Sequence, residues 1–260
     1  MEVIVLASPE EVCLRAARIA ARLIRAKPDA SLGLPTGNTP RGVYAELVRL
    51  HRAEGLSFAR ASAFGLDEYV GVGPDHPGAF RRTLHETLVR QVDLPPERAH
   101  SPDGRAADLP AACARYEGEI ASAGGLDLVV LGLGTDGHIA FNEPTSSLGS
   151  RTRIKTLADE TRAANQAAFG AEPVPRHAIT VGIATILAAR RCLLLAFGPS
   201  KAIAVAGMVE GPLTAMVPAS ALQLHPHATV LVDEAAATGL ALRAYYDAVA
   251  AAKPAWQRED

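Results

Sequence analysis

This sequence of 260 residues has only three cysteines, no long apolar run and no large excess of either sign of charge. Each of these features excludes a class of protein. The three cysteines, Cys13, Cys113 and Cys192, lie far apart within apolar or helical patterns. This spacing indicates buried thiols in a reducing compartment, not a disulfide framework or a cysteine-ligated metal site. No stretch approaches the roughly 18 apolar residues of a membrane span, and the N-terminus lacks the basic segment of a signal peptide. The sequence therefore predicts a cytoplasmic protein.

Net charge is close to zero, because 26 Lys and Arg residues face 28 Asp and Glu residues, and no run of like charge occurs. Binding to nucleic acid or to an anionic membrane requires a concentrated basic surface, which this composition does not offer. We therefore expect neither a nucleic-acid nor a membrane partner. Any binding site for a phosphate group must therefore be formed by a few neighbouring residues instead of an extended basic surface.

Short apolar runs alternate with longer amphipathic segments along the chain. The runs lie at residues 2–7, 30–35, 61–69, 126–134, 192–198 and 228–233. They are continuously apolar instead of alternating, which indicates strands buried on both faces. The pattern predicts an α/β fold with an open, mostly parallel, Rossmann-like sheet and helices on both faces. A hydrophobic content of 48% is enough for one sizeable core, so we expect a single domain over residues 1–260.

The first helix is expected to begin after Ser8. Ser8 suits the N-cap, Pro9 suits the first helical turn, and Glu11 is placed to close a capping box. In open parallel sheets, ligands bind at the carboxyl ends of the strands. Polar residues and glycines of this sequence concentrate where the predicted strands end, so we expect the functional site there.

One such strand end is "LPTGNTP", residues 34–40, with Thr36, Gly37, Asn38 and Thr39 ahead of a predicted helix. Backbone N–H groups at the start of a helix carry partial positive charge, and the two hydroxyls can donate to phosphate oxygens. Taken alone, the segment favours an ordinary strand-to-helix turn with Pro at the first helical position. An anion site is the alternative.

A second strand end is "FGLDEYVG", residues 64–71, where Asp67 and Glu68 close an apolar run. Partial burial beside a cleft raises the pKa of a carboxyl group and makes it a better acceptor for a proton from carbon. In the alternative interpretation, Asp67 caps the next turn and Glu68 lies in solvent or in a salt bridge. The dipeptide alone leaves both interpretations open.

The third strand end is "LGLGTDGHIAFNEP", residues 131–144. Its glycines permit tight backbone geometry, so Asp136 and Glu143 can flank the imidazole of His138. A histidine held by carboxylates has a defined tautomer and can exchange protons with a sugar hydroxyl or ring oxygen near neutral pH. A lone histidine in a loop is usually only a surface residue, but the joint pattern is much less common.

Taken together, these motifs resemble those of the glucosamine-6-phosphate deaminase (glucosamine-6-phosphate isomerase) family. The resemblance extends in order through "LGLPTGNTP", "LDEYVG", "LGLGTDGHIAFNEP", "SSLGSRTRIKTL", "TRAAN", "VPRHAITVGIATIL", "GPSKA" and "PASALQLHP". It implies a cytoplasmic enzyme that converts glucosamine 6-phosphate to fructose 6-phosphate and ammonia, with no metal and no organic cofactor. The expected partner is thus a small amino-sugar phosphate.

The resemblance also implies a role for each motif residue. Asp67 would take the C2 proton and deliver it to C1, and His138 would open the sugar ring with Asp136 and Glu143 in support. Lys201 of "GPSKA" would join the "PTGNT" turn at the phosphate, whereas without the resemblance it would be one more solvated lysine. His225 is interpreted as structural.

Two segments depart from the family pattern. The family usually carries an arginine where this chain has Ala167, and hydroxylated residues where it has Ala79 and Phe80. Unless Arg162 or Arg176 substitutes, loss of one bidentate contact to phosphate costs on the order of 1.5 to 3 kcal/mol. We therefore expect weaker binding of glucosamine 6-phosphate or a changed amino-sugar preference.

Some relatives are hexamers that bind N-acetylglucosamine 6-phosphate at an allosteric site between subunits, so a homo-oligomer is possible here. The matching residues are Ser146, Ser147, Arg153 and Lys155 in "SSLGSRTRIK". They are interpreted either as a regulatory site or as a basic loop retained for folding or subunit contact.

Two other functions stay open. A 6-phosphogluconolactonase shares this fold and needs one acid–base residue, but that function leaves Asp67 without a role. A sugar-phosphate sensor of a transcription regulator binds its ligand without transforming it, and usually has a DNA-binding helical module. This sequence starts at its first predicted strand and has no basic N-terminal extension.

Overall fold

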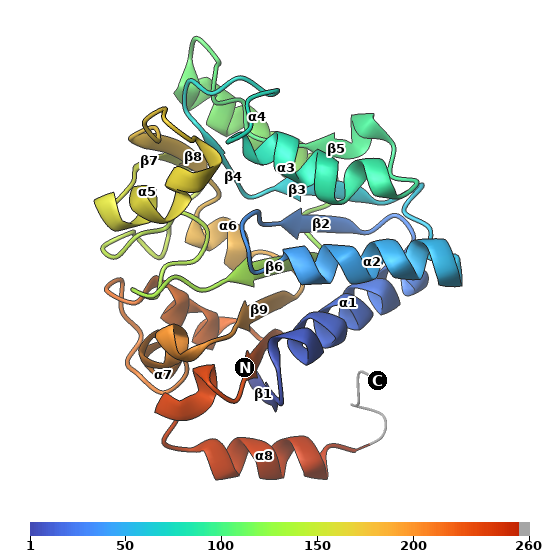
Figure 1. Ribbon diagram of the computed structural model, residues 1–260, viewed down its shortest axis with the longest axis vertical. Coiled ribbons are helices and arrows are strands. Elements are labelled where there is room, and N and C mark those ends of the chain that lie inside the picture. Colours follow the sequence, from blue (N-terminus) through green and yellow to red (C-terminus); the bar gives the residue numbers. More distant parts are fainter. Residues whose placement is uncertain (255–260) are drawn as a thin grey trace.

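Ten strands, within the residues 1–254 that the computed structural model describes, form two sheets (Figure 1). The strands are β1 (Glu2–Leu6), β2 (Ser31–Leu34), β3 (Ser62–Gly65), β4 (Asp67–Tyr69), β5 (Ala99–His100), β6 (Leu128–Gly132), β7 (Arg153–Thr156), β8 (His177–Thr180), β9 (Cys192–Ala196) and β10 (Ala228–Asp233). The α-helices are α1 (Pro9–Ala26), α2 (Arg41–Glu54), α3 (Phe80–Thr87), α4 (Leu109–Ser122), α5 (Asp159–Asn165), α6 (Ile183–Leu187), α7 (Ala202–Val209) and α8 (Arg243–Ala252).

The larger sheet has seven strands in the order β1-β10-β9-β6-β2-β3-β5, and every neighbouring pair is parallel. Successive residues of a strand face opposite sides of the sheet. Leu193 and Leu195 of β9 therefore pack in one core with α1, α2 and α3, whereas Leu194 and Ala196 pack in a second core with α4, α6 and α7. The predicted parallel sheet with helices on both faces is confirmed.

Helix α1 begins as the sequence predicts. The Glu11 N–H donates to Ser8 Oγ at 3.3 Å, and Pro9 occupies the first turn. The Glu11 carboxylate accepts from the Ala7 N–H at 3.2 Å, one residue before the N-cap, so the capping box is closed slightly outside its usual position. The three cysteines are buried and free. Within residues 1–254, no helix combines the length and the apolarity needed to cross a membrane.

The expected single strand over residues 61–69 is wrong in one respect, because two strands form there. Strand β3 lies in the parallel sheet, and β4 leaves it to pair antiparallel with β8. Leu66 makes the transition: its N–H donates to Leu34 in the large sheet at 3.2 Å, while its carbonyl accepts from Val181 at 2.9 Å. This change of partner carries Asp67 out of the parallel sheet.

The smaller sheet has the order β4-β8-β7 and is antiparallel throughout. Strands β5, β7 and β8 were not expected from the sequence, because none of them has the continuous apolar character of the others. Together with α5, this sheet lies beside the ends of β2 and β6 where those strands finish (Figure 1). The carboxyl edge of the parallel sheet is thus covered by a second layer, and the site residues lie in that region.

Candidate active site

The loop after β6 holds His138 close to its own backbone. A Cβ at Gly134 would overlap the His138 ring, and Gly137 has a positive φ of 85°, so both positions require glycine. Asp136 Oδ1 lies 2.7 Å from His138 Nδ1 and also accepts the His138 N–H at 3.1 Å. One carboxylate oxygen therefore sets both the backbone turn and the orientation of the ring.

Asp136 stays ionised in this arrangement. Its partial burial opposes ionisation, but the hydrogen bond and the charge of His138 outweigh that effect and hold the pKa of Asp136 well below its usual range. The Asp136 carboxylate is therefore suited to stabilise a protonated imidazole.

Glu143 connects the histidine to the segment that contains α5. Its Oε2 lies 3.6 Å from His138 Nδ1, while its Oε1 accepts from the Thr161 hydroxyl at 2.7 Å and from the Ala158 N–H at 3.3 Å. Glu143 is only 6% exposed and its Oε2 has no hydrogen-bond partner within the described residues. The predicted pair of carboxylates beside His138 is present, and Thr161 is an additional contact that the sequence did not reveal.

Asp67 lies at the start of β4 and is 9% exposed. Burial raises the pKa of Asp67 to about 7, although the Thr180 hydroxyl, the Phe141 N–H and the charge of His138 lower it. The Phe141 N–H lies 3.3 Å from Asp67 Oδ1. A carboxyl group with a pKa near neutrality is suited both to accept a proton and to return it.

Glu68 has a different role from either of the two that the sequence suggested. It is 5% exposed and its carboxylate accepts the N–H groups of Tyr69, Phe80 and Arg81 at 2.9 to 3.1 Å. Two of these N–H groups belong to the first turn of α3, where helix N–H groups have no intrahelical partner. Glu68 therefore caps α3, and Asp67 does not cap the turn.

The "PTGNT" loop joins β2 to α2 at the same edge of the large sheet. Gly37 has a φ of 111°, and a Cβ at Gly132 would lie 3.6 Å from Thr39 Oγ1, so the Thr39 hydroxyl lies over the end of β6. Lys201 ends a short 3-10 helix, Pro199–Lys201, directly before α7. Burial lowers the pKa of Lys201 while the charge of Asp136 raises it, which places the ammonium group near the histidine loop.

One departure from the family pattern, Phe80, lies in an aromatic cluster beside β4. Phe80 packs on Tyr69 with ring centroids 4.7 Å apart, and Phe169 meets Tyr69 edge-on at 5.1 Å. Ala167 is exposed in the 3-10 helix Gln166–Ala168 that leads to Phe169. Arg162 does not reach beyond this segment, because its guanidinium donates to the Val174 carbonyl and to Asp159.

The four residues matched to an allosteric site differ in their exposure and in their contacts. Ser147 is exposed, whereas Ser146 is 2% exposed and its hydroxyl has no partner within the described residues. Arg153 donates to Asn142 Oδ1 at 2.9 Å and leaves its buried Nη2 without a hydrogen bond. Lys155 lies two residues along β7, so both cations lie on one face of the strand, and burial lowers the pKa of Lys155.

Asp136, His138 and Glu143 also offer ligand atoms within 4.8 Å of one another, which is the geometry of a candidate metal site. Asp136 Oδ1 and His138 Nδ1 form a close ion pair at 2.7 Å, but this contact lacks the geometry of a hydrogen bond, and the buried Nδ1 has no hydrogen-bond partner within the described residues. An ionised carboxylate beside an imidazole is suited to acid–base chemistry. His225, expected to be structural, is 3% exposed and bonds the Ala189 carbonyl at 2.8 Å.

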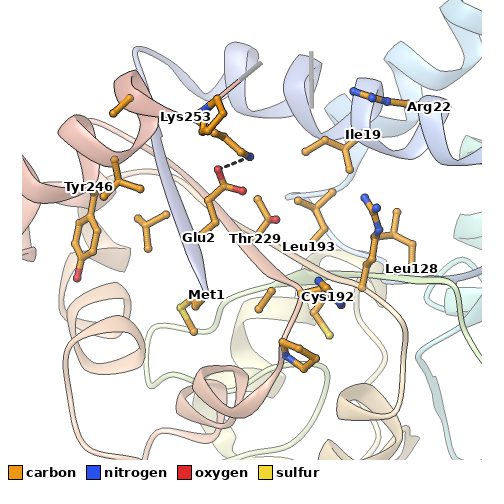
Figure 2. Close-up of a pocket in the computed structure, with 18 of the residues that line it drawn as sticks. Met1, Glu2, Ile19, Arg22, Leu128, Cys192, Leu193, Thr229, Tyr246 and Lys253 are labelled. Atoms are coloured by element: carbon orange, nitrogen blue, oxygen red, sulfur yellow. Dashed lines mark hydrogen bonds and ion pairs between the residues drawn. The ribbon is translucent and has the colours of Figure 1, made fainter. Parts of the chain in front are cut away.

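A large cavity of about 1020 Å³ lies at the opposite edge of the parallel sheet (Figure 2). It is lined by the first residues of four strands, Glu2, Leu128, Cys192 and Ala228, and by α8. Lys253 closes one side through an ion pair with Glu2 at 2.7 Å, drawn as a dashed line in Figure 2. None of the predicted site residues lines this cavity. The acid–base group and the "PTGNT" loop instead share the carboxyl edge, where ligands of such sheets bind.

Comparison with known proteins gives relatives over almost the whole chain. A family model described as glucosamine-6-phosphate isomerases/6-phosphogluconolactonase matches residues 7–232. A protein of Arthrobacter sp. (strain FB24) named glucosamine-6-phosphate deaminase is 52% identical over 258 residues, or 99% of each chain. A protein of the same name from Mycolicibacterium smegmatis is 52% identical over 259 residues, again 99% of each chain.

Solved structures show the same relationship. One described as a monomeric glucosamine-6-phosphate deaminase is 45% identical, with a TM-score of 0.90 over 92% of this chain and 100% of that one. A 6-phosphogluconolactonase from Trypanosoma cruzi is 23% identical, with a TM-score of 0.73 over 92% of this chain and 97% of that one. The second likeness shows a shared fold alone.

Proposed function

Since the chain belongs to the family of glucosamine-6-phosphate isomerases and 6-phosphogluconolactonases, we propose that it is an enzyme that converts glucosamine 6-phosphate and water to fructose 6-phosphate and ammonia. The observation that carries this proposal is the joint presence of Asp67 and the Asp136–His138–Glu143 group at the carboxyl edge of the sheet. A lactone hydrolase needs only one acid–base group, and a sensor needs none. Two separate acid–base centres support a reaction with two kinds of proton transfer.

In the first stage, His138 moves a proton between the C1 hydroxyl and the ring oxygen and so opens the sugar. Asp136 supports this step, because its ionised carboxylate 2.7 Å from Nδ1 stabilises the imidazolium form. Ring opening produces an aldehyde at C1, which acidifies the proton on C2.

In the second stage, Asp67 takes the C2 proton and returns it to C1. The product of this transfer is an imine at C2. Water adds to the imine and ammonia leaves, which yields the ketose. A base with a pKa of about 7 is suited to both halves of the transfer, since neither its loss nor its gain of a proton is strongly opposed at neutral pH.

The phosphate group of the substrate is assigned to the "PTGNT" loop and Lys201. Thr36, Gly37, Asn38 and Thr39 lie between β2 and the first turn of α2, where free N–H groups favour an anion. The half-buried Lys201 adds a full positive charge. The arginine that the family usually carries is missing from this site, because Ala167 occupies its position, and the guanidinium of Arg162 is bonded within its own segment.

The decisive experiment is Asp67→Asn, assayed for release of ammonia and fructose 6-phosphate. Asn keeps the shape of the side chain but cannot accept the C2 proton, so we expect turnover to fall by at least about 10³-fold while substrate binding changes little. Asp29→Asn is the matched control, because that carboxylate is 56% exposed and lies away from the site. Turnover of Asp67→Asn equal to wild type contradicts the proposal.

Substrate choice is tested with a panel of four compounds on the wild-type protein: glucosamine 6-phosphate, galactosamine 6-phosphate, unphosphorylated glucosamine and 6-phosphogluconolactone. We expect turnover of the first alone. Preference for another amino sugar would assign the departures at Ala79, Phe80 and Ala167 to a changed specificity. Hydrolysis of the lactone without release of ammonia would support the competing function.

Regulation by N-acetylglucosamine 6-phosphate through Ser146, Ser147, Arg153 and Lys155 is a separate proposal. The supporting observation is that Arg153 and Lys155 share one face of β7 and that Ser146 and Arg153 have buried polar atoms without partners among the described residues. A similar solved protein is described as monomeric, so an intersubunit site is not a general property of such relatives. Identical rate curves with and without the N-acetyl sugar would exclude activation.

A further inference from the structure

Thr180 lies directly opposite Asp67 in the antiparallel pair of β4 and β8. Residues directly opposite in such a pair have side chains on the same face of the sheet, with Cβ atoms roughly 5 Å apart. Thr180 is 0% exposed, and its hydroxyl oxygen accepts the Phe141 N–H at 3.0 Å. The same N–H lies 3.3 Å from Asp67 Oδ1. The Asp67 carboxyl group, the Thr180 hydroxyl and the Phe141 backbone N–H therefore lie together in a buried place.

The proton of the Thr180 hydroxyl has two acceptors available. The Val181 carbonyl lies 3.4 Å away and already accepts from the Asn142 side chain at 2.9 Å. The Asp67 carboxyl group is the other acceptor, since it accepts the same Phe141 N–H as the Thr180 hydroxyl, and the Thr180 hydroxyl lowers its pKa. A bond to a carboxylate is stronger than a long bond to a shared carbonyl. An ionised Asp67 is therefore the stronger of the two acceptors for the hydroxyl proton.

We propose that Thr180 is a positioning residue for proton transfer: its hydroxyl, held by the Phe141 N–H, orients the Asp67 carboxylate and stabilises its ionised form. This inference rests on the proposed function of Asp67. Nothing in the apolar run "HAITV" distinguishes Thr180 from an ordinary strand residue, and only the pairing of β4 with β8 gives it this place.

Other charged and titratable groups also face Asp67 and contribute to its titration. They are Glu68 and Tyr69 on β4, Tyr116 on α4 and His138 in the loop. Arg153 pairs with Thr180 from the opposite side of β8. None of them is altered by a substitution at Thr180. A change in the titration of Asp67 after such a substitution therefore reports on the hydroxyl.

The test compares Thr180→Val, which removes the hydroxyl at similar volume, with Thr180→Ser, which retains it. The Phe141 N–H keeps Asp67 Oδ1 as a partner in both variants. In the wild type we expect kcat/KM to rise with pH through about 7 as Asp67 ionises. In Thr180→Val the rise should move about one pH unit upward, which lowers kcat/KM about fivefold at pH 7 and about tenfold well below pH 7, and restores it above pH 9. Thr180→Ser should follow the wild type, and KM should change little in either variant.

Each outcome decides the question. The same pH profile for valine, serine and wild type overturns the proposal, as does a uniform loss of activity in Thr180→Val that alkaline pH does not restore. If Thr180→Val does not fold, Thr180→Ala replaces it as the variant without a hydroxyl. If neither folds while Thr180→Ser does, the hydroxyl serves stability and the proposal is overturned.

A measurement without substrate separates this inference from the proposed function. The infrared band of the protonated Asp67 carboxyl group, identified by its absence in Asp67→Asn, is titrated in wild type and in Thr180→Val. We expect the band to persist to higher pH in Thr180→Val. Absence of turnover in the wild type would reject the proposed function, but an unchanged infrared titration would reject the role of Thr180.

Discussion

The two sheets of this protein are built from different kinds of sequence and have different roles. The central strands of the parallel sheet, such as β6 "LVVLG" and β9 "CLLLA", are apolar and buried on both faces. The strands of the antiparallel sheet, "DEY", "RIKT" and "HAIT", carry charged and hydroxyl side chains even where they are buried. The larger sheet holds the molecule together, whereas the smaller sheet holds a carboxyl group in an environment that opposes its ionisation.

This difference shows why the two sheets are adjacent. Burial of Asp67 is unfavourable for the folded state once the carboxyl group ionises, so a separate source of stability must hold it in place. The apolar layers around the parallel sheet are that source. Substitutions in the parallel sheet should therefore lower stability and leave catalysis unchanged. Substitutions of site residues in the antiparallel sheet should lower catalysis without lowering stability.

The largest expected effect is a gain of stability from Asp67→Asn. Because the pKa of Asp67 is about 7 when folded, the wild type loses stability progressively as pH rises from the unfolded pKa through 7. Asn removes this loss, so the variant's advantage should be small at pH 4 and reach on the order of 4 kcal/mol above pH 7. Urea unfolding at pH 4, 6 and 8 measures it. A gain independent of pH would contradict the assigned burial of charge.

The next largest effect should come from Leu194→Ala in the centre of the parallel sheet. Leu194 is 0% exposed on β9, so we expect the free energy of unfolding to fall by about 3 kcal/mol, with unchanged kcat in the folded fraction. Leu224→Ala is the control, since that side chain is 62% exposed. A large fall in kcat without loss of stability would remove the contrast between the sheets.

Asp136→Asn should lower kcat about 100-fold, because the imidazolium form of His138 loses its ionic partner at 2.7 Å. Thermal unfolding should change little, since the Asp136 side chain is 38% exposed. Steady-state kinetics beside the Asp29→Asn control measure the effect. A kcat within threefold of wild type would show that His138 does not depend on this carboxylate.

The smallest expected effect is a gain of affinity from Ala167→Arg. The family resemblance places this position at the substrate phosphate, so a new charge-assisted contact should lower KM for glucosamine 6-phosphate about tenfold. Ala168→Arg is the control, because its side chain is also exposed in the same 3-10 helix. Equal KM values for the two variants would indicate that this segment does not contact the phosphate.

Much of the fold was predictable from local patterns. All six expected strands exist, and α1 has the N-cap that Ser8, Pro9 and Glu11 indicate. The run over residues 61–69 was assigned to one strand because its apolar character continues through Leu66. Periodicity does not report a change of hydrogen-bonding partner within a continuous run, so the break before Asp67 was missed. Strands β5, β7 and β8 were missed for a related reason, since their stability comes from pairing with distant segments.

The candidate site was predictable in part. The carboxylates beside His138 lie within one loop, and local spacing indicated their contact. The capping of α3 by Glu68, the bond from Thr161 to Glu143, and the contact of Thr180 with Asp67 all join segments far apart in the chain. No local signal marks such contacts.

The sequence by itself determined which chemical groups are available and where six of the seven strands of the parallel sheet lie, because both depend on residue type and local periodicity. Only the tertiary structure decided that Asp67 leaves that sheet, faces Thr180 and becomes buried beside the histidine loop. The pKa of a carboxyl group depends on the solvent and charges around it, and these are set by contacts between distant segments. The residue type of Asp67 follows from the sequence, and its pKa of about 7 follows from the fold.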